Sequence, residues 1–86
     1  MNVEKMTDNI NNALESVNYL ARRAKINANY TVTPCLGGWT LRNNHNVVTS
    51  INDSVGIVAL AQQNLLEKMV QVIENNDNID NLLNRM

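Results

Sequence analysis

Apolar residues recur at alternating spacings of three and four along two long segments of the chain. The first segment runs from about Val3 to Ile26, and the second from about Ile51 to Val72. This spacing places the apolar side chains on one face of an α-helix. The pattern therefore predicts two long helices, and the polar run at residues 75–78 predicts a break before a short final helix from about Ile79.

The first predicted helix carries signals for its two ends. Asn2 is a suitable N-terminal cap, and Arg22 and Arg23 stand in the last turn, where the helix dipole favours cations. We expect Asn27 to end this helix.

Between the two predicted helices, the spacing of apolar residues changes from the helical pattern to an alternation with a period of two residues. Residues 30–33 and 39–42 are short β-prone runs on either side of Gly37-Gly38, which predicts a two-stranded hairpin. Pro34 ends the first strand or confines it to an edge. Residues 47–48 either extend a strand or lead into the second helix, and Ser50, with Asp53 three residues later, resembles a capping box for that helix.

These elements predict a mainly α fold with a single domain over residues 1–86. It consists of two long antiparallel helices, a short C-terminal helix and a small hairpin insertion. A chain of 86 residues has a marginal core of its own, and its single Cys35 cannot form an internal disulfide. We therefore expect a helical-bundle homo-oligomer.

The second helix supplies the predicted oligomer seam. A second apolar row (Leu60, Leu66, Ile73) widens the face beyond a two-stranded seam and suits a bundle. The amide of Gln62 either fixes the register of the seam or faces solvent, and Asn76 is interpreted as part of the helix break. The seam consists of Ile51, Val55, Val58, Gln62, Leu65, Met69 and Val72.

Composition and charge narrow the classes of function. A net charge of −1 argues against a broadly basic nucleic-acid surface, and no stretch is long and apolar enough to span a membrane. One Cys and one His are too few for a zinc site, and no cofactor or metal is predicted. A free cysteine without an export signal indicates the cytoplasm.

The residues with the richest chemistry gather between positions 19 and 45. All three aromatic residues and four of the seven cations lie there. Flat rings beside arginines suit an anionic, aromatic ligand such as a cyclic nucleotide, and glycines let backbone amides approach an anion. Alternatively, the cations serve the helix dipole and the rings pack in the core. The candidate ligand-binding residues are Tyr19, Arg22, Arg23, Lys25, Tyr30, Gly37, Gly38, Trp39, Arg42 and His45.

No motif in the chain identifies an enzyme or a family. Cys35 with His45 would make a nucleophile and a base, but the sequence offers no third group to orient them. We therefore predict a non-enzymatic oligomer that binds or sequesters an anionic small ligand, in the manner of some small phage proteins. The alternative is an adaptor or inhibitor of a host protein, or a structural assembly protein, that uses its long helical face and Trp39.

Overall fold

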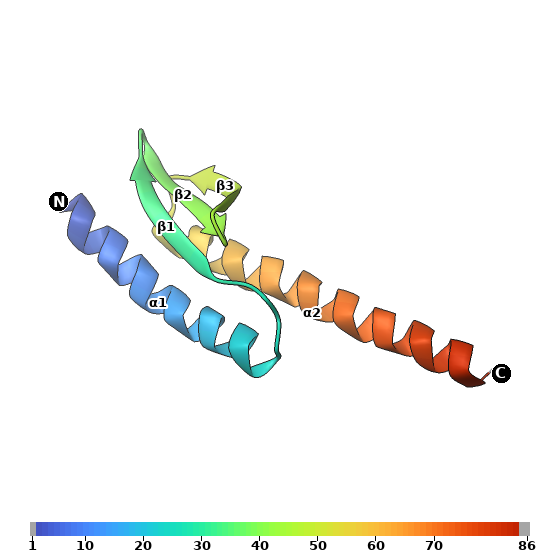
Figure 1. Cartoon of the computed structure of the whole chain (residues 1–86). Helices are drawn as coiled ribbons and strands as arrows, with labels where there is room; N and C mark the ends of the chain where they lie inside the picture. Colours follow the sequence, from blue (N-terminus) through green and yellow to red (C-terminus); the bar gives the residue numbers. More distant parts are fainter. Residues whose placement is uncertain (1, 85–86) are drawn as a thin grey trace.

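The computed structural model describes the backbone of residues 2–84 and the side chains of residues 2–75. Two helices flank three strands in the order α1 (Val3–Arg23), β1 (Tyr30–Cys35), β2 (Gly38–Asn43), β3 (Asn46–Ile51) and α2 (Ser54–Asn84). Figure 1 shows the two helices lying under the sheet, with α2 continuing well past the end of α1.

The expectation of a mainly α bundle with a two-stranded hairpin is wrong, because β3 adds a third strand. The sheet is an antiparallel meander in the order β1-β2-β3. Trp39 pairs with Ile51 in the β2–β3 ladder, and a bulge shifts the register between Leu41 and Arg42. The segment 46–51 is rich in β-branched residues, which favour a strand over the first turn of a helix.

The third strand also reverses the predicted direction of α2. Three antiparallel strands bring the chain back to the beginning of α1, so the two helices run parallel and not antiparallel (Figure 1). One groove between the helices is accordingly lined by Met6 and Val55, which lie near the starts of the two helices. It is also lined by Ala13 and Gln62, which lie about two turns further along. An even number of strands would have given the predicted antiparallel pair.

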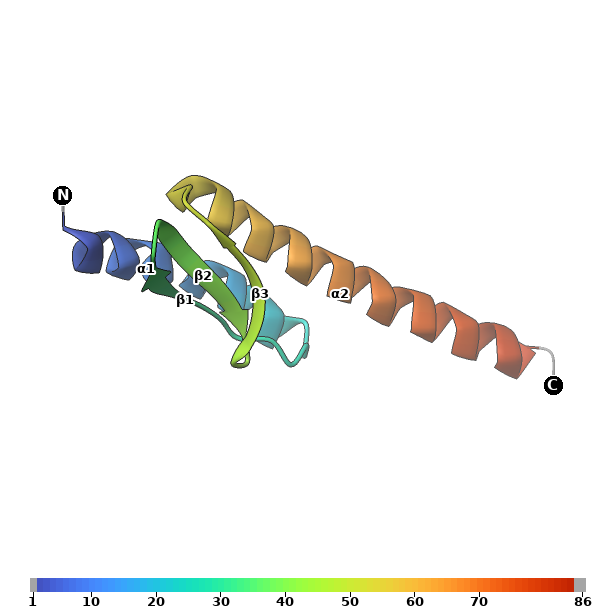
Figure 2. The same ribbon diagram turned by 90° about the horizontal axis from the view of Figure 1, so that it is seen from above.

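The core lies between the helices and one face of the sheet. Viewed from above, α1 runs beside β1, and α2 lies on the side of β3 (Figure 2). Aliphatic side chains of both helices meet the inward residues of β1 and β2. The buried apolar residues are Ile10, Leu14, Val17, Ala21, Ala28, Tyr30, Val32, Trp39, Leu41, Ile57, Ala61 and Leu65.

Two asparagines of α1 close the outer edge of the sheet. Asn18 exchanges hydrogen bonds with the backbone N–H and carbonyl of Tyr30, and Asn11 does the same with Val32. These groups point away from β2, so without the amides they would form an unpaired strand edge. The helix thus takes the place of a fourth strand.

The helix ends differ in detail from the predicted ones. Asn2 caps α1 through a bond from the Lys5 N–H, as expected. The helix ends before Asn27, because Lys25 adopts a positive φ of 57° and the N–H of Ile26 bonds back to the Ala21 carbonyl. This is the Schellman arrangement, here with lysine where glycine is usual.

The N-terminal cap of α2 is also displaced from the predicted position. Ser50 lies in β3, and the carboxylate of Asp53 accepts the N–H of Val55 at 3.0 Å. Because β3 takes up residues 46–51, the helix cannot begin where the capping box predicted, and Asp53 becomes the cap itself.

Helix α2 is continuous to Asn84, so the predicted break at residues 75–78 and the separate final helix are wrong. That run contains neither Gly nor Pro, and Asn or Asp costs a helix interior only about 0.7 kcal/mol per residue relative to Ala. The side chain of Asn76 lies outside the described residues. The long helix gives the molecule extents of 61 × 21 × 19 Å.

Candidate functional site

The two aromatic rings at the centre of the predicted ligand site are buried in the core. Tyr30 is 1% exposed, and its hydroxyl donates to Asn64 Oδ1 at 2.6 Å. Trp39 is 7% exposed, and its Nε1 donates to Thr7 Oγ1 at 3.0 Å. Both rings are packed and hydrogen-bonded, so neither presents a face for stacking on a ligand, and Trp39 is not an exposed anchor for a protein partner.

The other predicted ligand residues are divided between the two ends of the sheet. Gly37 lies in the β1–β2 turn, and Gly38 begins β2 beside the backbone of Ile51 and Asn52. The β2–β3 turn holds His45 and lies at the opposite end, close to the loop that follows α1. The ten candidates therefore do not line one pocket.

One subset of the predicted residues does share an end of the body. The exposed Arg22 and Arg23 end α1, and Lys25 follows them. Three hydrogen bonds from Asn44 tie the β2–β3 turn to the loop beyond Lys25. Its N–H donates to the Asn29 carbonyl, and its Nδ2 donates to both the carbonyl and Oδ1 of Asn27.

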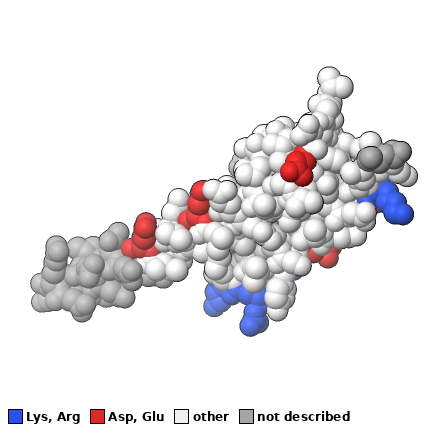
Figure 3. All heavy atoms as spheres, turned by 180° about the vertical axis from the view of Figure 1, so that it is seen from behind, with Lys and Arg blue, Asp and Glu red and all other residues white. Residues whose placement is uncertain are grey.

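The same turn brings further polar groups to this end. Arg42 Nη1 donates to the carbonyl of His45 at 3.5 Å. In Figure 3 cations gather at the bottom of the body, and acidic side chains are spaced along the helix that leads to the grey residues. Tyr19 is exposed on α1 near this end.

Cys35 and His45 are not brought together. Cys35 is exposed at the end of β1, next to the β1–β2 turn, whereas His45 lies in the β2–β3 turn at the other end of β2. Within the described residues no cluster of three His, Cys, Asp or Glu side chains has the geometry of a metal site. None of the described helices is long and apolar enough to cross a membrane.

The predicted seam residues are distributed over several environments. Ile51 lies in β3 and Leu65 in the core, where each packs within its own chain. Met69 packs partly against the core, and Val72 is exposed beyond it. Only Val55, Val58 and Gln62 share a surface feature, described next.

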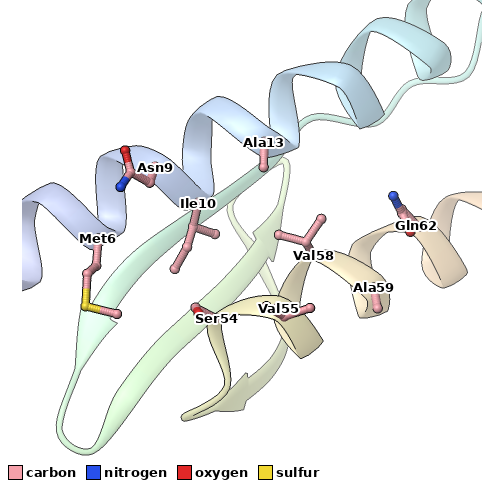
Figure 4. Close-up of a pocket in the computed structure, with 9 residues that line it drawn as sticks. All are labelled: Met6, Asn9, Ile10, Ala13, Ser54, Val55, Val58, Ala59 and Gln62. Atoms are coloured by element: carbon pink, nitrogen blue, oxygen red, sulfur yellow. The ribbon is translucent and has the colours of Figure 1, made fainter.

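These three residues line a groove between α1 and α2, here called the interhelix groove. It has a volume of about 460 Å³. Figure 4 shows Ile10 and Val58 pointing toward each other across the gap, with the sheet behind the two helices. The amides of Asn9 and Gln62 lie at its rim, and none of the described residues that line it is charged. The lining residues are Met6, Asn9, Ile10, Ala13, Ser54, Val55, Val58, Ala59 and Gln62.

A second apolar feature stands further along α2. Leu66, Val70 and Ile73 are 59%, 51% and 58% exposed, and their spacing of four and three places them in one row. We call this row the apolar ridge. Met69 is the last described α2 residue that packs against the core, and residues 70–84 form an extension of α2 beyond it. Val70 and Ile73 of the ridge belong to this extension. The sequence pattern indicates part of this ridge, because Leu66 and Ile73 belong to the second apolar row. The pattern does not point to Val70 of the ridge or to Ala59 of the groove.

Comparison with protein-family models, with curated proteins and with solved structures found no match to this chain.

Proposed function

We propose that this protein is a non-enzymatic assembly module whose copies associate through α2. The observation that carries the proposal is the exposure of the apolar ridge on a helix that leaves the body. Three large aliphatic side chains more than half exposed in one row form an unusual surface for an isolated chain, and such rows are typical of helix–helix interfaces.

The exposed area supports the same proposal. The chain exposes 6289 Å². A compact monomer of this size exposes about 5,100 Å², so the excess is about 1,200 Å². A stable interface takes about 800 Å² from each partner. The radius of gyration of 16.0 Å likewise exceeds the value of about 12 Å that a compact chain of this length has.

Sedimentation velocity over protein concentrations from nanomolar to submillimolar tests this proposal. We expect a mass of at least two chains for the unaltered protein. Replacing Leu66 and Val70 with Glu should shift the sample to a single chain, because charges on the ridge must then be desolvated in the interface. Thr31→Glu with Thr33→Glu, two exposed sites on β1 away from α2, is the matched control and should behave like the unaltered protein. A monomer throughout the range would refute the proposal.

The proposal includes a cytoplasmic location, which rests on the free and exposed thiol of Cys35. A host protein as an additional partner stays a prediction.

Binding of an anionic ligand is the second candidate function. The observation that favours it is the gathering of Arg22, Arg23 and Lys25 near the β2–β3 turn, which holds His45 and follows Arg42 of β2. Without Tyr30 and Trp39, this end offers charge and not base stacking. A thermal-shift screen with nucleotides and cyclic nucleotides tests it, with Arg22→Gln plus Arg23→Gln as the comparison. The idea is lost if no anion raises the melting temperature of the unaltered protein.

A further inference from the structure

We infer that the apolar ridge of each copy is seated in the interhelix groove of a second copy, so that two chains form a closed, antiparallel dimer. The inference rests on the self-association proposed above. It adds the receiving surface, the direction of the two α2 helices and the number of subunits.

The ridge and one wall of the groove belong to a single stripe on α2. Its members follow at spacings of four, three, four, four and three, so they share one face of the helix. The first half of the stripe is flanked by α1 and forms the groove, whereas the second half stands alone as the ridge. The stripe consists of Val55, Ala59, Gln62, Leu66, Val70 and Ile73.

The two surfaces match in length and in chemistry. The groove runs along α1 from Met6 to Ala13, and the ridge runs from Leu66 to Ile73. Each distance is seven residues of helix, or about 10 Å. The ridge residues are aliphatic and the groove lining is uncharged, so no charge would be buried between them. The groove also has small walls at Ala13 and Ala59, which leave room for large side chains.

A second copy is the occupant that we propose, because its ridge matches the groove in length and chemistry and a chain cannot fill its own groove. The groove wall at Val55–Gln62 and the ridge at Leu66–Ile73 lie on the same uninterrupted helix. The sheet lies behind the two helices when the groove is viewed from its open side (Figure 4). Two copies can therefore meet helix to helix with their sheets on the outside.

The symmetry of the stripe favours an antiparallel pair. Val55 and Ile73 lie at equal distances before and after Asn64, and so do Gln62 and Leu66. Antiparallel α2 helices centred near Asn64 therefore place each ridge against the other copy's groove, twice in one dimer. Gln62, the one polar member of the stripe, falls near the two-fold axis, where an amide can fix the register.

Two other arrangements use the surfaces less completely. A parallel, in-register pair would set ridge against ridge and leave both grooves empty. A head-to-tail contact would fill one groove and leave a ridge and a groove free at the two ends, so copies would add until a ring or filament formed. The closed dimer fills both grooves and covers both ridges.

A mixing experiment with two variants of the full chain tests the inference. The ridge variant carries Leu66→Glu and Val70→Glu, and the groove variant carries Ala13→Glu and Ala59→Glu. Glutamate on both surfaces ensures that mixing creates no new ion pair. All four positions are exposed in the single chain, and circular dichroism would verify folding. Val55→Glu, at a residue 77% exposed, is a second groove variant if the double one does not fold.

We expect the unaltered protein to have the mass of two chains over at least a 100-fold range of concentration. Each variant alone should dimerise at least 100-fold more weakly. An equimolar mixture should dimerise at concentrations where neither variant does, but more weakly than the unaltered protein. A mixed dimer keeps one unaltered ridge–groove contact, whereas its second contact sets Glu against Glu and each pure variant has no unaltered contact.

Other results would overturn the inference in distinguishable ways. If the groove variant dimerises like the unaltered protein while the ridge variant does not, the ridge packs elsewhere and only the self-association holds. If the mixture fails to associate, ridge and groove are not partners. Growth of the unaltered protein beyond two chains indicates the head-to-tail arrangement. A monomeric unaltered protein removes both this inference and the proposed function.

Discussion

The side-chain amide of Asn18 completes the backbone hydrogen bonding of Tyr30. Its Oδ1 accepts the Tyr30 N–H at 2.6 Å, and its Nδ2 donates to the Tyr30 carbonyl at 3.0 Å. Asn11, two helical turns earlier, serves Val32 in the same way. The attachment of α1 to the sheet is therefore directional as well as apolar, since an amide side chain provides both a donor and an acceptor.

We expect Asn18→Ala to lower the free energy of unfolding by about 3 kcal/mol, because it leaves a buried donor and a buried acceptor without partners. Urea unfolding measured by circular dichroism gives the value. Asn12→Ala, at an exposed site in the same helix, is the control and should change stability by no more than about 0.5 kcal/mol. Alanine favours a helix interior over asparagine, so propensity alone would stabilise both variants. A loss for Asn18→Ala no larger than that for Asn12→Ala would contradict the attachment of α1 to β1 through Asn18.

The two adjacent glycines should respond differently to alanine. A Cβ on Gly38 would collide with the carbonyl oxygen of Ile51 and lie 2.7 Å from the Asn52 Cα, so backbone must move. A Cβ on Gly37 meets nothing within 4 Å, but its φ of +84° is unfavourable for alanine. We expect a loss of about 1 kcal/mol for Gly37→Ala and at least about twice that for Gly38→Ala, from urea unfolding. The reverse order would contradict the close approach of β2 to the end of β3.

The single tryptophan gives an optical test of the core. Thr7→Val keeps the shape of the side chain but removes the acceptor of the Trp39 Nε1 bond, which should cost about 1–3 kcal/mol. Thr33→Val, at an exposed site on β1, is the comparison and should stay within about 0.5 kcal/mol of the unaltered protein. Trp39 emission should resist quenching by iodide in the folded unaltered protein. Ready quenching there would contradict the burial of the ring.

Alkaline pH should destabilise the protein partly through Tyr30. Burial, and secondarily the negative charge of Glu67, raises the pKa of the Tyr30 hydroxyl above its ordinary value of 10.0. The folded state therefore holds this proton more tightly than the unfolded state does. The contribution of this proton to the free energy of unfolding is fully present below about pH 10. It is lost as pH rises through the higher pKa of the folded state.

Urea unfolding from pH 8 to 11 measures this effect when the unaltered protein is compared with Tyr30→Phe. The variant should be less stable at pH 8, because Asn64 loses its donor, and its stability should fall less steeply above pH 10. Tyr19→Phe, at an exposed ring, should leave the steep fall unchanged. Parallel curves for Tyr30→Phe and the unaltered protein would exclude Tyr30 as the source.

Local pattern predicted the elements of this fold better than their arrangement. The spacing of apolar residues located α1 to within three residues of its end and identified β1 and β2, because both signals are local. The sequence does not decide β3, since Val47 and Val48 fit a strand as well as a helix start. That one strand decides whether α1 and α2 are parallel, so a local ambiguity became an error in topology.

The predicted sites were limited for a related reason. Tyr30 and Trp39 are aromatic residues with polar ends, and the sequence does not show that Asn64 and Thr7 satisfy them inside the core. The seam spacing on α2 was real, but the pattern does not show which part of the helix the body covers. Leu65 and Val72 follow the same spacing, yet one is buried and the other is 44% exposed, because the body ends between them.

The parallel packing of α1 with α2 also bears on the order of events during synthesis. Helix α1 leaves the ribosome before α2, yet the residues that cover it include Ile57, Ala61 and Leu65 of α2. In a nascent chain that ends after β3, the apolar residues of α1 and the sheet that α2 would cover are exposed to solvent. The native fold must therefore wait until the core residues of α2 have emerged, and chains truncated before α2 are expected to be ready targets for chaperones or proteases.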